Sequence, residues 1–475
     1  MTGVSFGKKM WIFFLLAFLI AAVFQFAHPA FLSADYRHLP GIGLMISQWA
    51  IILAVLFTAW REKLIQIKGN GQGIFLLICA MGLGLCYGIF ANDGMRAMNF
   101  PVMIAVTAQA LFSIGGVNGH SALSGQGLYE GLRRFFPALF SRVSLPFQAI
   151  SAAFQEKNPR MRGIGWGLLL CIPVVLIAVL LLSSADGIFG GMVQGAVESA
   201  GKIDGQFVRK VAFTVLMGLM LFSFLCTAVE NGKELLPARE RAVAPAVLIP
   251  VLGMLVAVYG LFVYVQFRYL FGNGETALMA GGYAEYARSG FFQLVLLALL
   301  TLALILPSLA LCRESKAVRA LCAMVAGLTI IIDFSAFFRM RLYILHFGLS
   351  LLRVVTLWGM LATLAALVMC IVKCFKPSLG ISVPIAIAVL ASWLMLNFCN
   401  VDVRIAQYNV HAYNTGVLAE LDAVYLAELS PDVLPALQKI QDEDAKQAAL
   451  EQAMAIWEEA APCAYDWSLS WLRVK

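Results

Sequence analysis

Residues 291–311 read FFQLVLLALLTLALILPSLAL, a run of mostly apolar side chains that contains no charged residue. At a rise of ~1.5 Å per residue, about 20 such residues cross the ~30 Å hydrocarbon core of a bilayer as one α-helix. A membrane-spanning β-strand would instead alternate apolar and polar residues over about ten positions. The run therefore predicts a transmembrane helix.

The composition of the whole chain extends this prediction to a polytopic membrane protein. The chain has 475 residues, of which 61% are hydrophobic and 13% are charged, and its mean hydropathy is +0.85. A soluble domain carries roughly 25% charged and 45–50% apolar residues. We therefore expect an all-α integral membrane protein with about eleven transmembrane helices. The expected spans cover residues 10–27, 42–60, 73–91, 99–117, 164–183, 207–229, 244–271, 288–311, 318–338, 342–372 and 381–399.

The distribution of basic residues orients these spans. With a cytoplasmic N-terminus, 19 of the 34 Lys and Arg residues fall in inner segments, and every inner loop holds at least two. Membrane proteins keep Lys and Arg in their cytoplasmic loops, so we expect the N-terminus inside. An odd number of spans then places the tail, residues 400–475, outside the membrane, and this tail is acidic. The first apolar run is too long for a signal peptide and lacks an A-x-A-like site, so we expect it to stay as a helix.

Four segments follow from this map. Residues 1–117 form an N-terminal four-helix membrane segment, 118–163 a cytoplasmic loop, 164–399 a seven-helix membrane core and 400–475 an extracytoplasmic helical tail. The loop has apolar residues at helical spacing with basic residues between them: Leu132, Arg133, Arg134, Phe135, Phe136, Leu139, Phe140 and Arg142. Such a segment can lie in the headgroup plane and attract anionic lipid, or it can be an elbow that joins two helix bundles.

One expected hairpin carries several ionisable residues, which are costly inside spans and mark either pairing or function. Asp333 falls near the outer end of the span 318–338, and Arg339 and Arg341 fall in the turn that follows it. The residues that share one face of the next span are Tyr343, His346, Ser350 and Arg353. Arg353 would lie ~16 Å below the turn, with Asp333 as its expected partner. The pair is either an internal salt bridge or part of an anion or proton site, in which His346 could titrate near neutral pH.

Further ionisable residues gather at the expected outer interface. The basic ones are Arg209, Lys210, Arg268, Arg288, Arg339 and Arg341, and the carboxylates that could orient or pair with them are Asp186, Glu285, Asp333 and Asp402. A guanidinium binds phosphate or carboxylate through two parallel hydrogen bonds, so this set suits an anionic ligand such as a lipid phosphate or an envelope precursor. The candidate ligand-binding residues are Arg268, Arg288, Arg339, Arg341, Tyr343, His346 and Arg353. The alternative is anchoring by ordinary headgroups, with Glu285 and Arg288 simply pairing at i and i+3.

The chain lacks the short motifs that carry common chemistries. It contains no P-loop, HExxH, GxSxG or Gly-Asp intramembrane protease pattern, so we name no catalytic residue, metal ligand or cofactor. The ten cysteines form no CxxC pair, and most fall inside expected spans, where cysteine acts as a small apolar residue. The basic residues sit in short loops beside apolar spans, which gives no reason to expect nucleic acid.

Several phrases in the chain resemble a known family. They are SSADGIF at 183–189, FVYVQFRYLFG at 262–272, YAEYARSGFF at 283–292, RMRLY at 339–343, FGLS at 347–350, NVD at 400–402, YN at 408–409 and LSPD at 429–432. Over residues 160–440 the chain resembles the bacterial multi-pass membrane proteins grouped as domain of unknown function four-one-seven-three, and its relative four-one-five-three. One departure is Ser350, where we expect threonine. The resemblance implies a bacterial plasma membrane protein and supplies no activity.

Three readings of function follow. The first is a non-enzymatic membrane protein that binds an anionic ligand at its outer face, as a transporter or as an envelope sensor. The second is an envelope transferase that acts on a lipid-linked substrate, with Asp186 or Glu285 as general base. The third is a structural or partner-docking protein that uses its acidic tail. The lipid bilayer is the partner that all three readings share.

Overall fold

The computed structural model describes residues 8–27, 39–61, 63, 70–148, 205–229, 243–271, 291–459 and 466–473. Within these ranges the regular elements are all helices, which confirms the expected all-α class. The chain divides into two compact units. Unit 1 contains the helices up to α9 and unit 2 those from α10 to α20.

In the described part of unit 1 the chain forms long apolar helices and one shorter helix, α5. They are α1 (Lys8–Ala27), α2 (Ile42–Arg61), α3 (Gly71–Ile89), α4 (Asp93–Ile114), α5 (Gly125–Phe140) and α9 (Gly205–Ala228). α1 packs along α9, while α3 packs against both α2 and α4. Gln48 of α2 fixes this last group, because its buried Nε2 donates to the carbonyl oxygen of Ala80 and to Oγ1 of Thr107, at 2.9 Å each. One amide thus joins three helices.

Two helices of unit 1 begin earlier than hydropathy predicts. α3 and α4 start at Gly71 and Asp93, whereas the apolar runs start at residues 73 and 99. An asparagine caps each start: Asn70 accepts from the Gly73 amide at 2.9 Å, and Asn92 from the Met95 amide at 2.7 Å. An N-cap side chain satisfies a backbone donor that a helix start leaves open, so it can extend a span into a polar first turn.

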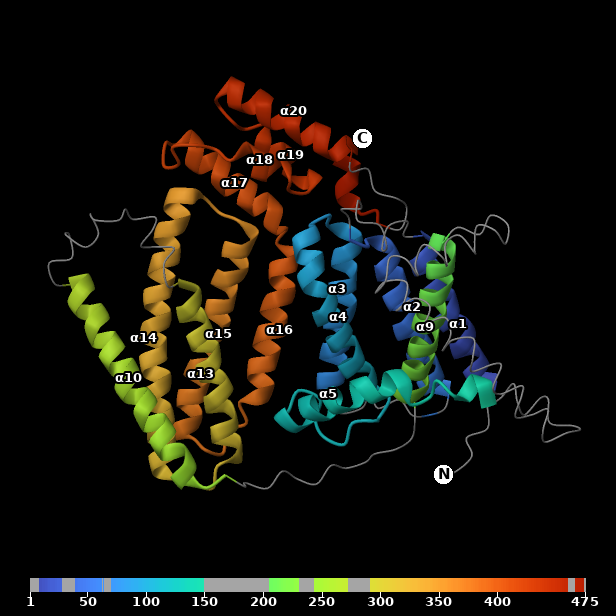
Figure 1. Cartoon of the computed structure of the whole chain (residues 1–475), viewed down its shortest axis with the longest axis horizontal. Coiled ribbons are helices and arrows are strands. Elements are labelled where there is room, and N and C mark those ends of the chain that lie inside the picture. Colours follow the sequence, from blue (N-terminus) through green and yellow to red (C-terminus); the bar gives the residue numbers. More distant parts are fainter. Residues whose placement is uncertain are drawn as a thin grey trace, which may run out of the picture. The chain divides into compact units, whose positions relative to one another are not determined.

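The described residues of unit 2 form five long helices and a helical tail. The long helices are α10 (Pro245–Phe271), α13 (Phe291–Leu311), α14 (Lys316–Phe347), α15 (Leu351–Phe375) and α16 (Ser382–Phe398). α14 packs against α10, α13 and α15, and these helices form one group around it (Figure 1). Their core is apolar and includes the fully buried Leu252, Ile305, Val325 and Leu367.

The tail of unit 2 continues directly from α16. Its elements are α17 (Val401–Asn414), α18 (Ala423–Ala427), η1 (Pro431–Val433), α19 (Leu434–Leu437), α20 (Glu443–Glu459) and η2 (Leu469–Arg473). α16 and α17 meet at an angle of 64°. Asn400 makes this bend in the left-handed conformation, with φ 49°, and its side chain donates to Asp432 at 2.8 Å. Asparagine adopts that conformation more readily than other non-glycine residues.

Eight of the described helices are long and apolar enough to cross a membrane, or nine if the bent pair α16 and α17 forms one span. The chain is therefore a multi-pass membrane protein. One of the eleven expected spans, 164–183, lies outside the described residues. The apolar part of α1, Met10–Phe26, is shorter than the eight.

The expected hairpin between residues 318–338 and 342–372 forms, but its turn lies at a different position from the one predicted. α14 runs without a break to Phe347, and α15 begins at Leu351, so the chain turns at Gly348 instead of at Arg339 and Arg341. Arg339 to His346 form the last turns of α14. Charged residues suggested an exposed turn, but the helix-breaking signal is Gly348, which has φ 73°.

Replacing Gly84 of α3 by alanine should destabilise unit 1. A Cβ at Gly84 overlaps Oε1 of Gln48. Moving that amide disturbs its two buried hydrogen bonds, at a cost of roughly 1–3 kcal/mol. Thermal unfolding of the purified protein in detergent measures this effect. The matched control is Gly359→Ala in α15, where a Cβ meets nothing within 4 Å. Equal loss of melting temperature in both variants would contradict the role of Gln48.

Candidate functional site

The structure describes part of the candidate set. Asp186, Glu285 and Arg288 lie outside the described residues. Arg268 belongs to the last turn of α10, and its side chain is not among those described. The candidates whose side chains are described belong to unit 2 and are Asp333, Arg339, Arg341, Tyr343, His346, Arg353 and Asp402. All but Asp333 lie toward the C-terminal end of α14, where the tail contacts the turn before α15. We call this the tail end of unit 2.

Arg353 caps the end of α14 and does not pair with Asp333. Its Nη1 donates to the carbonyl oxygen of Phe347 at 2.9 Å and to that of Gly348. Its guanidinium also stacks over the ring of Tyr343, with the central carbon 4.3 Å from the ring centroid. The carbonyls at a helix C-terminus carry partial negative charge, so a cation there is stabilised. The expected depth of Arg353 is therefore wrong, because it lies in the first turn of α15.

The tail clamps the turn between α14 and α15. Asn409 of α17 accepts from the Leu349 amide at 2.6 Å and donates to the Leu349 carbonyl oxygen at 2.9 Å. The hydroxyl of Tyr425 accepts from the Leu351 amide at 2.8 Å. Burial raises the pKa of Tyr425 although the Leu351 amide lowers it, so this hydroxyl stays neutral at physiological pH. Two tail side chains thus satisfy the backbone of the turn.

Asp402 and Asp432 form bonds to other residues of the tail. Asp402, which is buried, accepts from the Ser430 amide at 3.1 Å. Asp432 accepts from Ser470 at 2.6 Å and forms an ion pair with Arg473 at 2.8 Å. Asp402 was expected to orient the arginines at the outer interface. One of its hydrogen bonds is to a backbone amide, which fixes α17 against the segment before η1.

Asp333 differs from the other candidates because it is buried in the core of unit 2, away from the tail end. Its side chain is only 5% exposed, on the face of α14 that carries Ile332 and Ala336 into the core. Among the described residues it has no hydrogen-bond or ion-pair partner. Two residues further along α14, Ser335 donates to Gln266 of α10 at 2.9 Å. A buried carboxylate at this position is therefore not explained by packing or by the salt bridge expected from the sequence.

The remaining candidates differ in exposure. Arg339 is only 9% exposed and lies closer to the tail end of α14 than Asp333. Arg341 and His346 are exposed, and the His346 ring packs edge-on against Phe347 at 4.7 Å. The structure thus separates a buried Arg339 from an exposed Arg341 and from an Arg353 that is held by helix carbonyls.

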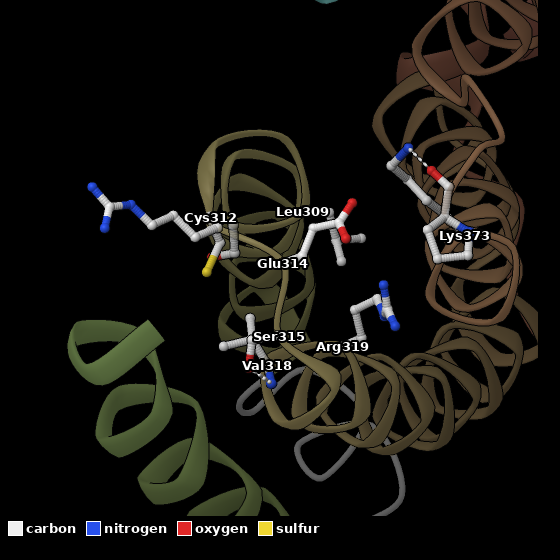
Figure 2. Close-up of a pocket in the computed structure, with 10 residues that line it drawn as sticks. Leu309, Cys312, Glu314, Ser315, Val318, Arg319 and Lys373 are labelled. Carbon is white, nitrogen blue, oxygen red and sulfur yellow. Dashed lines mark hydrogen bonds between the residues drawn. The ribbon is translucent and has the colours of Figure 1, made fainter. Parts of the chain in front are cut away.

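A small pocket lies at the opposite end of the same helices. It has a volume of about 40 Å³ and is lined by Glu314, Arg319 and Lys373 among others. Figure 2 shows Glu314 and Arg319 reaching from the junction of α13 and α14 toward α15. Lys373 donates to the carbonyl oxygens of Leu379 at 2.7 Å and Pro377 at 3.4 Å. The volume admits a few water molecules but is far below the ~300 Å³ of a typical ligand pocket.

The fold and these side chains define an all-α multi-pass membrane protein with ionisable groups buried in both of its units. The chain matches the family described as Domain of unknown function (DUF4153) over residues 50–440, so it belongs to that family. This is the relative named second in the resemblance, and four-one-seven-three itself is not the family that matches. No curated protein and no solved structure matches the chain.

Sequence reasoning missed the roles of Asn409 and Tyr425. Asn409 stood in one of the phrases that carry the family resemblance, but nothing in its spacing points to Leu349, which is 60 residues away in the chain.

Among the described residues no group of three His, Cys, Asp or Glu side chains could hold a metal ion.

Replacing Asn409 by alanine should release the turn between α14 and α15. The change leaves the amide and carbonyl of Leu349 without their partner, at a cost of roughly 1–3 kcal/mol. We expect a lower melting temperature and faster proteolysis at residues 348–350. Asn414→Ala is the matched control, because Asn414 lies on the same helix and bonds Lys439 and Gln441 at the surface. Cleavage at the turn that rises equally in both variants would argue against the clamp.

Proposed function

We propose that this chain is a multi-pass protein of the bacterial plasma membrane that binds an anionic ligand at the tail end of unit 2, as a transporter or as an envelope sensor. In this proposal the N-terminus is cytoplasmic and the tail lies outside, in line with the distribution of basic residues. The ligand class is a lipid phosphate or an envelope precursor. Arg339 and Arg341 would hold the anion, with Arg268 and Arg288 as further cations of the same set.

The observation that carries the proposal is that α14 buries two ionisable side chains, Asp333 and Arg339. A carboxylate inside a membrane helix bundle costs several kcal/mol unless it is paired and hydrogen-bonded. Asp333 has no partner among the described residues and is 5% exposed. Ionisable residues that are kept at such a cost mark ion and substrate pathways in membrane proteins. This supports a function for unit 2 beyond structure, and Asp333 would couple binding to a cation or a proton.

The position of Arg339 supports an anion as the ligand. Its guanidinium is largely removed from solvent. Screening by water and salt is weak at such a site, so an anion there interacts more strongly than at an exposed arginine. Nη1 of Arg353 already donates to Phe347 and Gly348, so this guanidinium has a structural role at the end of α14. We centre the proposed site on Arg339, because its guanidinium is more deeply buried than that of Arg353.

One observation favours the structural reading as a second candidate. The tail uses Asn409, Tyr425 and Asp402 to hold its own fold and the turn before α15. A tail that clamps a turn can act as a scaffold without binding any ligand. The transferase reading gains nothing from the geometry, because its candidate bases Asp186 and Glu285 lie outside the described residues.

Anion binding is tested by native mass spectrometry of the purified protein, with phosphatidylglycerol and phosphatidylcholine added as probes. We expect retention of the anionic lipid and a roughly 10- to 100-fold loss of affinity in Arg339→Gln, since a charge-assisted hydrogen bond contributes about 1.5–3 kcal/mol. Arg353→Gln is the matched control and should lower the melting temperature while retaining the lipid. Equal retention by Arg339→Gln and the unmodified protein would refute the site at Arg339.

The role of Asp333 is tested by Asp333→Asn, which keeps the shape and removes the charge. If the carboxylate serves function rather than stability, the variant should melt at a higher temperature, because an isolated buried charge destabilises the fold. A salt bridge predicts the reverse, since removing one partner of a buried pair costs about 3–5 kcal/mol. A lower melting temperature would therefore identify Asp333 as structural.

A further inference from the structure

Helix α5 of unit 1 is amphipathic with its apolar stripe turned outward. Its buried side consists of Gly127, Glu130, Gly131 and Ala138. The large apolar residues on the other side are exposed: Leu128, Tyr129, Leu132, Phe136 and Phe140, with Leu132 64% exposed. Leu128, Leu132, Phe136 and Phe140 recur every four residues, so they form one continuous stripe along the helix.

The buried side of α5 is fixed by its hydrogen bonds. Glu130, which is fully buried, accepts from the amides of Gly119 at 3.1 Å and His120 at 3.3 Å, and its other oxygen lies 2.6 Å from Nδ1 of His120. Gln109 of α4 donates to the carbonyl oxygen of Gly127 at 2.9 Å. At the far end, Ser223 of α9 donates to the Ala138 carbonyl oxygen at 2.7 Å. These bonds prevent α5 from rotating its apolar stripe into unit 1.

The charge on α5 is positive where it meets solvent. Its only acidic residue is Glu130, which is buried and bonded on the inner side. Arg133 is exposed and lies next to Leu132 and Phe136, while Arg134 is partly buried. The exposed surface of α5 therefore combines large apolar side chains with positive charge.

We propose that the exposed face of α5 lies in the headgroup layer of the membrane that unit 1 spans, and that it recognises anionic phospholipid. α5 starts at Gly125, a short distance along the chain from the end of α4 at Ile114, and it runs across the direction of α4 and α9 (Figure 1). A helix that follows a span closely and lies across it is placed at the bilayer surface. Burial of a large apolar side chain contributes about 1.5–3 kcal/mol, which the headgroup and acyl boundary supplies.

The arginine gives the proposed contact its lipid preference. A basic residue at a membrane surface gains about 1 kcal/mol from anionic lipid, which corresponds to about fivefold in surface partitioning. A purely apolar stripe would bind zwitterionic and anionic bilayers equally. Arg133 beside the stripe therefore predicts a preference for phosphatidylglycerol over phosphatidylcholine.

The test places a fluorescent non-natural amino acid at Leu132, and separately at the exposed Ser144, in the full chain. The protein is reconstituted in vesicles of phosphatidylcholine, with or without phosphatidylglycerol. Lipid-borne nitroxide should quench the probe at position 132, and aqueous iodide should quench the probe at position 144. Phosphatidylglycerol should raise the lipid quenching at position 132, and Arg133→Gln should reduce that increase by a factor on the order of five.

Three results would overturn the proposal or part of it. Iodide quenching at position 132 as strong as at position 144 would place the stripe in water. Protection at position 132 that disappears when the protein is diluted in excess lipid would identify a second copy of the chain as the occupant. A phosphatidylglycerol effect that persists in Arg133→Gln would remove the arginine from lipid recognition and refute that part.

Discussion

The carbonyl groups at the end of α14 impose the constraint on which unit 2 depends. Helix termini leave backbone groups without partners, and in or near hydrocarbon no water replaces those partners. The structure meets this demand from two directions. Arg353 of the next helix binds the carbonyls of Phe347 and Gly348, and Asn409 of the tail binds both backbone groups of Leu349. The tail is thereby part of the membrane unit and not an appendage.

This constraint also separates the arginine that stabilises the end of α14 from the other residues of the proposed site. Arg353 has a structural reason to be there, because its Nη1 donates to helix carbonyls and its guanidinium covers the ring of Tyr343. Asp333 has no comparable explanation in the described helices for being ionisable where it is buried. Function in unit 2 is therefore better sought along α14 than at the turn that joins it to α15.

Much of the fold can be predicted from the sequence, because a helix that crosses the hydrocarbon core must be a long run of apolar residues. The bounds of α2, α10 and α16 lie within a residue or two of their predicted limits. The errors arise where hydropathy and hydrogen bonding disagree. Asn92 lets α4 begin in polar sequence, and α14 passes through Arg339 to end at Gly348. The site was predicted less well, since one misplaced turn moved Arg353 to another depth, and the partners of Leu349 lie far along the chain.

The clamp on Leu349 has a consequence for biogenesis. Leu349 and Arg353 are synthesised well before Asn409 and Tyr425, which complete the turn. Until α17 and α18 have emerged on the same side of the membrane, the α14–α15 hairpin is inserted but its turn is not yet hydrogen-bonded. Translation arrest or a premature stop within that interval would leave a nearly full set of spans with an open turn. A quality-control protease could use that open turn to distinguish unfinished chains from finished ones.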